Sequence, residues 1–465
     1  MGGAHAGIGR AWVTATVVGV ALALAHAPLL RAQPPAGAPP SSADERRCTG
    51  QAPASAEAQA AACTALIDSG RYSGQNLAIL HSNRGIARAK AGDFARAIAD
   101  FEAAIRINPR HVRAHINLGN AYYAKGDYDH AIESFGEAIR LDPRAAAIYM
   151  SRANAYDAKG DSARAIADYD RAIALDPGFA TAYFNRGVAH RRQGDIDRAI
   201  ADYDQAIRLN PKYVAAFNNR GIALADRGEY DRAIADYDQA VKLDPAYVSA
   251  YTNRGNARRA KGELDRAAAD FEAAIKLDPK FALAYLNRGL VWYDKKDYDR
   301  AIADFDEAIR LAPGDGRAYD NRGTALQAKG EFDRALADFD RAIALDPKNA
   351  HAFANRGNVF RSTGRLDRAL ADYGRAIELA PDHPRAFYDR AQAHFLAGDF
   401  RAALADAERA AALNPNAADV LSLRGLVREK LGARAGAIAD FRRALALDVM
   451  LSQASAGLRR LGAAP

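Results

Sequence analysis

The residues best suited to chemistry in this sequence are aspartates that recur as Asp-Tyr-Asp, at residues 202–204 and again at 236–238. Carboxylates are the usual ligands of Ca²⁺ and Mg²⁺. On an α-helix, however, residues two positions apart point about 200° away from each other, because one turn takes 3.6 residues. Such a pair therefore cannot hold one ion between its two side chains.

A second pair of carboxylates, Asp127 and Asp129, is explained better by helix capping than by metal binding. Aspartates at the start of a helix accept hydrogen bonds from its free N–H groups and favour its positive end. A calcium-binding loop would need further oxygen ligands within twelve residues, and Ala131 and Ile132 supply none. The pair therefore indicates the start of a helix.

No catalytic motif accompanies these carboxylates. The sequence lacks a glycine-rich phosphate loop, a His-Glu-x-x-His motif and a Gly-x-Ser-x-Gly motif, and its ten histidines are scattered. The net charge of +7, from 64 basic and 57 acidic residues, is small for 465 residues and does not by itself imply nucleic acid. We expect no enzyme activity, no metal and no cofactor; a detected metal or turnover would overturn this expectation.

Cys48 and Cys63, the only cysteines, are separated by fourteen residues. In an oxidising compartment two such cysteines usually form a disulfide. A bridge that closes a loop of about fifteen residues stabilises a fold by about 3 kcal/mol. This bridge would fix the preceding segment to a helix that we expect at residues 57–67. The alternative is two buried free thiols, and no nearby histidine completes a metal site.

The N-terminus has the pattern of a secretory signal. Arg10 precedes the uncharged run 11–25, small residues follow, and no acidic residue occurs before Asp44. We therefore expect a signal peptide within residues 1–32. The alternative is an uncleaved N-terminal anchor, because residues 11–30 are about long enough to span a bilayer.

The remaining chain follows one period of 34 residues. The tripeptide Asn-Arg-Gly recurs with its glycines 34 residues apart, as at Gly187, Gly221 and Gly255. Eleven repeats without insertion or deletion fill residues 78–451, and such a period is typical of a solenoid. Repeat 1 begins at Ala78 and repeat 11 at Ala418, and a position is counted from the first residue of its repeat.

Each repeat predicts two antiparallel helices. In repeat 2 the first helix is expected over residues 112–125, where Gly126 suits the left-handed position that ends a helix. The second helix is expected to run to about Leu141, because Asp142 precedes a proline and avoids helical geometry. Two helices and a short turn, repeated along the chain, predict an all-α protein.

Small residues mark where the helices must approach closely. Position 20 and position 27 are alanine in all eleven repeats, and position 8 is glycine in nine. Helix axes come within about 8 Å only where side chains are small. An aromatic residue stands at position 24 in ten repeats, with Ala407 as the exception. We interpret this aromatic stripe as core rather than as a cofactor site.

With proline at position 32 in ten repeats, these features resemble the tetratricopeptide repeat family. The resemblance implies a right-handed α-solenoid of eleven helix-turn-helix units with a C-terminal capping helix. It also implies a concave groove lined by the first helices and a role as an interaction scaffold. The sequence departs from the family pattern at two positions. Position 7, often leucine in the family, is arginine in ten repeats, and position 11, often aromatic, is mixed here.

We expect the chain to divide into five parts. Residues 1–32 are the signal peptide or anchor, 33–47 a flexible lead-in, 48–77 a helical N-terminal cap with the cysteine pair, 78–451 the repeats, and 452–465 the end of the capping helix and a tail.

The arginine at position 7 is matched by aspartate at position 23. Both residue types occur in ten repeats, and one repeat breaks both at once, with Leu118 and Ser134. We therefore expect an ion pair inside each repeat, for example between Arg220 and Asp236. The alternative is two independent solvated charges, which would contribute about 0–1 kcal/mol if they paired at the surface.

By resemblance, positions 2, 5, 9, 12 and 13 face the groove, where arginines, asparagines and aromatics alternate. Arginine favours carboxylates through two parallel hydrogen bonds, so an acidic or C-terminal peptide is the expected ligand. The lysine of the family's carboxylate clamp is missing, which argues against chaperone tails. The expected groove residues are Arg113, Asn120, Tyr123, Asn154, Phe184, Arg191, Arg192, Asn256, Arg259, Tyr293, Arg317, Asn358, Arg361, Arg385 and Tyr388.

The sequence thus predicts a non-enzymatic scaffold that binds a protein or peptide and is exported to the periplasm or secreted from a bacterium. One alternative is a structural factor that docks onto an envelope membrane complex, which an uncleaved leader would favour. A distant alternative is an RNA-binding helical repeat; we expect no nucleic acid, and RNA binding that weakens with salt would revive it.

Overall fold

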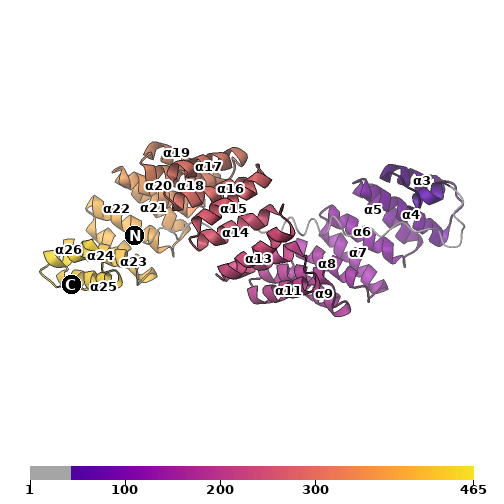
Figure 1. Ribbon diagram of the computed structural model, residues 1–465, viewed down its shortest axis with the longest axis horizontal. Coiled ribbons are helices and arrows are strands. Elements are labelled where there is room, and N and C mark those ends of the chain that lie inside the picture. The colour runs from indigo at the N-terminus through magenta and orange to yellow at the C-terminus, as the bar shows by residue number, and fades with distance from the viewer. Residues whose placement is uncertain (1–42, 465) are drawn as a thin grey trace. The chain divides into compact units, whose positions relative to one another are not determined.

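The computed structural model describes residues 43–464, and within this range every regular element is an α-helix (Figure 1). The predicted all-α class is therefore confirmed. The helices are α2 (Ala43–Cys48), α3 (Ala56–Asp68), α4 (Gly74–Lys90), α5 (Phe94–Ile107), α6 (Val112–Ala124), α7 (Tyr128–Leu141), α8 (Ala146–Lys159), α9 (Ser162–Leu175), α10 (Ala180–Arg192), α11 (Ile196–Leu209), α12 (Val214–Asp226), α13 (Tyr230–Leu243), α14 (Val248–Ala260), α15 (Leu264–Leu277), α16 (Ala282–Asp294), α17 (Tyr298–Leu311), α18 (Gly316–Lys329), α19 (Phe332–Leu345), α20 (Ala350–Ser362), α21 (Leu366–Leu379), α22 (Pro384–Ala397), α23 (Phe400–Leu413), α24 (Ala418–Lys430), α25 (Arg434–Leu447) and α26 (Ser452–Arg460).

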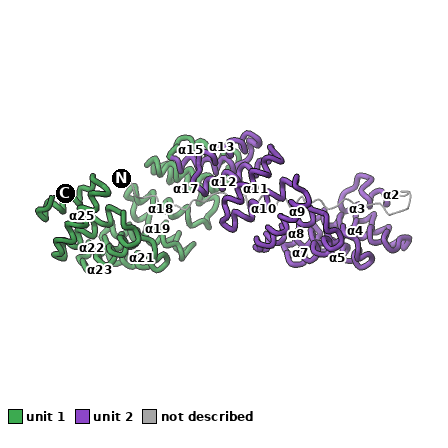
Figure 2. Tube along the Cα trace, turned by 90° about the horizontal axis from the view of Figure 1, so that it is seen from below, with its two compact units in different colours: residues 1–11, 262–465 green, residues 12–261 purple. Residues whose placement is uncertain are grey.

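The described chain divides into two compact units, residues 43–261 and residues 262–464 (Figure 2). Within each unit, a first helix packs against the second helix of its own repeat, and that second helix packs against the next first helix. First helices also contact each other, for example α6 with α8 and α20 with α22. Each unit is therefore a solenoid of helix pairs in which the first helices form a layer.

Repeat 2 shows how local sequence sets the helix boundaries. The first helix, α6, ends at Ala124, and Gly126 follows with a φ of 79°. Asp127 caps α7, because its carboxylate accepts a hydrogen bond from the backbone N–H of His130 at 3.3 Å. Asp129 lies in the first turn of α7 but makes no cap hydrogen bond; it pairs instead with Lys159 of the next repeat. The expected capping role is thus confirmed for Asp127 alone.

The helical N-terminal cap begins at residue 43, earlier than the expected boundary at residue 48. Residues 43–47 were expected in a flexible lead-in, but they form α2, in which Glu45 is buried and paired with the Tyr72 hydroxyl. The fully buried Cys48 and Cys63 form a disulfide with a Cα–Cα distance of 4.8 Å, so the expected pairing is confirmed in the structure. This bridge joins the end of α2 to α3. The expected signal peptide and residues 33–42 lie outside the described residues.

The aromatic residue at position 24 fills the core opposite the glycine at position 8. Phe305 is fully buried, and a Cβ added at Gly289 would lie 2.6 Å from Phe305 Cε1. Glycine is therefore favoured here by the close approach of the ring. Repeat 10 combines Ala391 with Ala407, so the larger residue at position 8 faces a smaller one at position 24. The predicted core role of the aromatic stripe is confirmed.

Replacing Ala233 of α13 with leucine is expected to lower the stability of the surrounding helices by about 1–3 kcal/mol. Ala233 is fully buried among close-packed side chains, so three added carbons force neighbouring residues away. Native-state hydrogen exchange of α12 and α13 measures this loss. Exchange equal to that of the parent protein would show that the tight contact lies elsewhere.

Among the described residues, no helix is both long and apolar enough to cross a membrane.

Candidate functional site

The ion pairs predicted within the repeats are present. Arg220 donates from Nε to Asp236 Oδ2 at 2.8 Å and from Nη2 to Asp236 Oδ1 at 2.6 Å. In repeat 2, which carries leucine at position 7, the Ser134 hydroxyl donates instead to the backbone carbonyl of His130. Equivalent pairs join Arg84 to Asp100, Arg152 to Asp168, Arg186 to Asp202, Arg288 to Asp304, Arg322 to Asp338, Arg356 to Asp372, Arg390 to Asp406 and Arg424 to Asp440.

Five of these arginines have a second carboxylate partner, which the sequence analysis did not predict. Arg220 Nη1 donates to Asp204 at 2.6 Å, and Asp204 stands at position 25 of the preceding repeat. Asp-Tyr-Asp therefore serves two arginines, because its carboxylates point in different directions along the solenoid. The recurrence of aspartate at position 25 was the feature of the sequence that could have indicated this second ion pair. The other pairs of this kind are Arg186 with Asp170, Arg254 with Asp238, Arg322 with Asp306, and Arg356 with Asp340.

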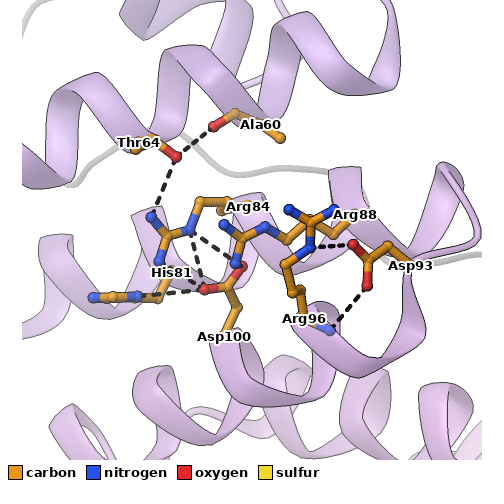
Figure 3. A network of polar contacts seen from close by, with 8 residues as sticks. All are labelled: Ala60, Thr64, His81, Arg84, Arg88, Asp93, Arg96 and Asp100. Atoms are coloured by element: carbon orange, nitrogen blue, oxygen red, sulfur yellow. Dashed lines mark hydrogen bonds and ion pairs between the residues drawn. The ribbon is translucent and has the colours of Figure 1, made fainter.

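Figure 3 shows the first of these arginines, in repeat 1. Asp100 accepts from Arg84 Nη2 at 2.8 Å and from Arg88 Nη1 at 2.8 Å. The Nη1 atom of Arg84 donates to the Thr64 hydroxyl at 3.2 Å, whereas the Nη1 atoms of five later arginines donate to an aspartate. These contacts hold neighbouring helices together. In the part of the chain that the structure describes, no group of three metal-binding side chains comes together.

Three of the expected groove residues are buried, which corrects their assignment as ligand contacts. Asn154 accepts from the Tyr169 hydroxyl at 2.6 Å and from Asn185 Nδ2 at 3.0 Å. Phe184 packs in the core against aromatic rings, and Tyr388 is also buried. Asn185 of the following repeat covers Asn154, whereas the rings of Tyr203 and Tyr213 on Phe184 belong to its own repeat. A side chain that faces the groove by its position is thus enclosed where its neighbours are large.

Four of the expected groove arginines are already paired with carboxylates of this chain. Arg191 contacts Asp226 at 3.0 Å, and Arg192 contacts the buried Asp157 at 2.7 Å. Arg317 pairs with its helix-capping Asp315, and Arg385 lies 3.2 Å from the buried Asp389 and 3.5 Å from Asp419. Carboxylates of this chain therefore largely compensate the positive charge of these four arginines.

The buried acids themselves were missed from the sequence. Burial raises the pKa of Asp157 above its ordinary value, although Arg192 opposes this, and burial acts in the same direction on Asp389. The first-helix face (the side chains at positions 2, 5, 9, 12 and 13) is thus of mixed charge. A single repeat does not reveal the pairing of Asp157, because its partner Arg192 stands on the next first helix, whereas Asp389 pairs with Arg385 of its own helix.

The remaining groove residues keep exposed surface. Arg113, Asn120 and Tyr123 lie on one face of α6, and the Arg113 side chain makes no hydrogen bond or ion pair with the described residues. Tyr123 packs on Tyr128 with ring centroids 5.3 Å apart, and Tyr293 packs on Tyr298 at 5.5 Å. Partly exposed as well are Asn256 and Arg259 on α14, and Asn358 and Arg361 on α20.

The tyrosine hydroxyls at position 24 differ in whether they have a hydrogen-bond partner. The Tyr237 hydroxyl is buried without a hydrogen-bond partner among the described residues, whereas the Tyr169 hydroxyl donates to Asn154. Replacing Tyr169 with phenylalanine is expected to cost about 1 kcal/mol, and the same change at Tyr237 to cost nothing or to stabilise. Hydrogen exchange of α9 and α13 measures both. Equal losses at the two sites would contradict the assignment.

The stacked helix pairs, the tight glycine–aromatic contacts and the capped turns define an α-solenoid of helix-pair repeats. Family models described as tetratricopeptide repeat match residues 83–146, 117–180, 150–208, 184–248, 252–316 and 321–384, and a second such model matches 357–424. These matches cover well over half of the chain, which therefore belongs to the tetratricopeptide repeat family. No curated protein matches the sequence.

Several solved structures are similar to this chain. The Cut9–Hcn1 hetero-tetramer of APC/C is 16% identical, with a TM-score of 0.49, and the match covers 90% of this chain and 96% of that one. A tetratricopeptide repeat protein from Parabacteroides merdae is 23% identical, with a TM-score of 0.44, and the match covers 53% and 97%. YrrB, described as having an unusual peptide-binding site, is 28% identical, with a TM-score of 0.33, and the match covers 40% and 95%.

Proposed function

We propose that this protein is a non-enzymatic scaffold that binds a peptide or partner protein along its first-helix face. Membership of the tetratricopeptide repeat family supports protein binding in general. The observation that carries the specific site is on α6, where Arg113, Asn120 and Tyr123 stand on one face with exposed surface.

The chemistry of α6 suits an acidic or C-terminal peptide. Arg113 has no carboxylate partner among the described residues, unlike Arg191 and Arg192, and it is free to make a bidentate contact. The Asn120 amide can bind a peptide backbone, and the Tyr123 ring offers a rigid apolar surface. The expected acidic preference is thus narrowed from the whole face to this helix.

Photo-crosslinking in cells tests this proposal. A photo-reactive residue at Tyr123 is expected to capture a specific partner, and one at the exposed Arg140 on α7 is expected not to. Arg113→Glu should abolish the capture by repelling an acidic ligand, whereas Arg113→Lys should retain part of it. Equal capture from Tyr123 and Arg140, or capture that survives Arg113→Glu, would contradict the proposal.

We further propose that the scaffold works outside the cytoplasm, in the periplasm or beyond. The signal-like pattern of residues 1–32 and the buried Cys48–Cys63 disulfide support this location, because disulfides persist in oxidising compartments. N-terminal sequencing of the protein from a periplasmic fraction is expected to show a start between residues 26 and 33. An intact N-terminus in a cytoplasmic fraction would refute export.

A further inference from the structure

Five of the ten arginines at position 7 bind a second carboxylate through Nη1, and Arg152 and Arg390 are two of those that do not. Arg152 and Arg390 bind Asp168 and Asp406 through Nε and Nη2 at 2.7–2.8 Å, as in the other repeats. Their Nη1 atoms make no hydrogen bond with the described residues. The reason lies at position 25 of the preceding repeat, which is glycine in both cases, Gly136 and Gly374.

The five aspartates at position 25 show what this place accommodates. Each binds its arginine Nη1 at 2.5–2.6 Å, and each carboxylate still has exposed surface, from 35% for Asp204 to 62% for Asp340. The place beside Nη1 is therefore accessible from solvent and shaped for a carboxylate. These five aspartates show how a carboxylate from another molecule would bind to an arginine whose Nη1 atom has no partner.

At the two glycines this place is open. A Cβ built at Gly136 would meet only Arg152 Nη1 within 4 Å, at 3.9 Å, and one built at Gly374 would meet only Arg390 Nη1, also at 3.9 Å. The backbone thus reaches the same point as in the other repeats, but no side chain fills the space. We call these two places the Gly136 slot and the Gly374 slot.

The surroundings of both slots carry a second cation. Arg152 and Arg171 lie at 5.8 and 5.9 Å from the Tyr149 ring centroid. At the second slot, Arg390 and Arg409 both lie at 5.9 Å from the Phe387 ring centroid. Glu137, next to Gly136, is paired with Arg140, and near Gly374 the acids Asp372 and Glu378 are paired with Arg356 and Arg375. An incoming anion is therefore attracted rather than repelled.

We propose that the Gly136 and Gly374 slots are carboxylate-binding sites that accept an acidic side chain of a partner polypeptide. The bound aspartate or glutamate would take the place that Asp170 or Asp340 takes in other repeats and complete the charge of Arg152 or Arg390. The sites lie between α7 and α8 and between α21 and α22, so they are separate from the ligand contacts proposed on α6. They stand whether or not α6 binds a peptide.

Nuclear magnetic resonance of the full chain with ¹⁵N-labelled arginine side chains tests the proposal. The probe is the blocked tripeptide acetyl-Ala-Glu-Ala-amide, titrated at constant ionic strength. We expect saturable shifts of the Arg152 and Arg390 guanidinium signals, and none at Arg186 or Arg356, whose positions beside Nη1 are filled by Asp170 and Asp340. Absence of shifts at Arg152 and Arg390, or equal shifts at Arg356, would overturn the proposal.

Matched variants separate slot binding from general attraction to arginine. Gly374→Asp should abolish the shift at Arg390 by filling the slot from within, whereas Gly374→Ala should leave it, because its methyl group is accommodated. Asp340→Gly should create a new response at Arg356. A shift at Arg390 that persists in Gly374→Asp would refute the assignment of the slot.

A second arm distinguishes the source of the carboxylate. Sodium acetate at the same carboxylate concentration supplies the charge without a polypeptide. Tighter binding of the tripeptide than of acetate is expected, because neighbouring backbone and methyl groups add contacts. Equal affinity for the two would overturn the polypeptide assignment in favour of a small free carboxylate.

Discussion

Replacing Arg220 with leucine is expected to destabilise the helices around it by about 3–5 kcal/mol, because it leaves the buried Asp236 without its partner. Asp236 is 5% exposed and accepts two hydrogen bonds from Arg220. Burial raises the pKa of the Asp236 carboxyl even with Arg220 beside it. A charged carboxylate at this buried position is therefore strongly destabilising by itself, and without Arg220 no ion pair offsets this destabilisation.

Repeat 2 provides a natural control for this experiment, since it carries Leu118 and Ser134 at the two positions. The double variant Arg220→Leu with Asp236→Ser is expected to recover most of the loss, because neither charge is then buried alone. Native-state hydrogen exchange of α12 and α13 is the suitable measurement, because solenoids open locally rather than as one cooperative unit. Additive losses of the two single variants would contradict the pairing.

Asp204→Ala is the second control. Asp204 binds the same guanidinium through Nη1 but is 35% exposed, so its loss is expected to cost only about 0–1 kcal/mol. The difference between Asp204 and Asp236 isolates the effect of burial, because both carboxylates bind the same arginine.

The part of the fold predicted most fully from the sequence is the part that repeats. The 34-residue period located both helices of repeat 2 to within a residue, because Gly126 and Asp142 end helices by local backbone preferences. The ion pair within a repeat was also predictable, since Leu118 and Ser134 change together. These inferences need only the geometry of one repeat.

The contacts between repeats were less predictable. Asp204 lies as far before Arg220 in the sequence as Asp236 lies after it, and helix periodicity alone does not show that one arginine serves both. The burial of Asn154 depends on Asn185 of the next repeat, and Phe184 packs on Tyr213, the last residue of its own repeat. The linear pattern assigns a face to a side chain, but the size of its neighbours decides its exposure.

The contact between position 8 and position 24 predicts that Gly289→Ala destabilises the protein when Phe305 is present and stabilises it when Phe305 is replaced by alanine. Replacing Phe305 with alanine is expected to cost about 3–5 kcal/mol, because a fully buried ring leaves a cavity. In the parent protein, Gly289→Ala is expected to cost about 1–3 kcal/mol, because its methyl group would lie 2.6 Å from the Phe305 ring. Repeat 3 combines Ala153 with Tyr169, so the ring can be displaced, which keeps this cost moderate.

In the Phe305→Ala protein, the same Gly289→Ala change is expected to stabilise. The methyl group then fills part of the cavity, and alanine is a better helix former than glycine by about 1 kcal/mol. Repeat 10 already carries this combination, as Ala391 and Ala407. Hydrogen exchange of α16 and α17 in the four proteins measures the sign in each background. A destabilising effect of Gly289→Ala in both backgrounds would show that the ring at position 24 is not what requires glycine at position 8.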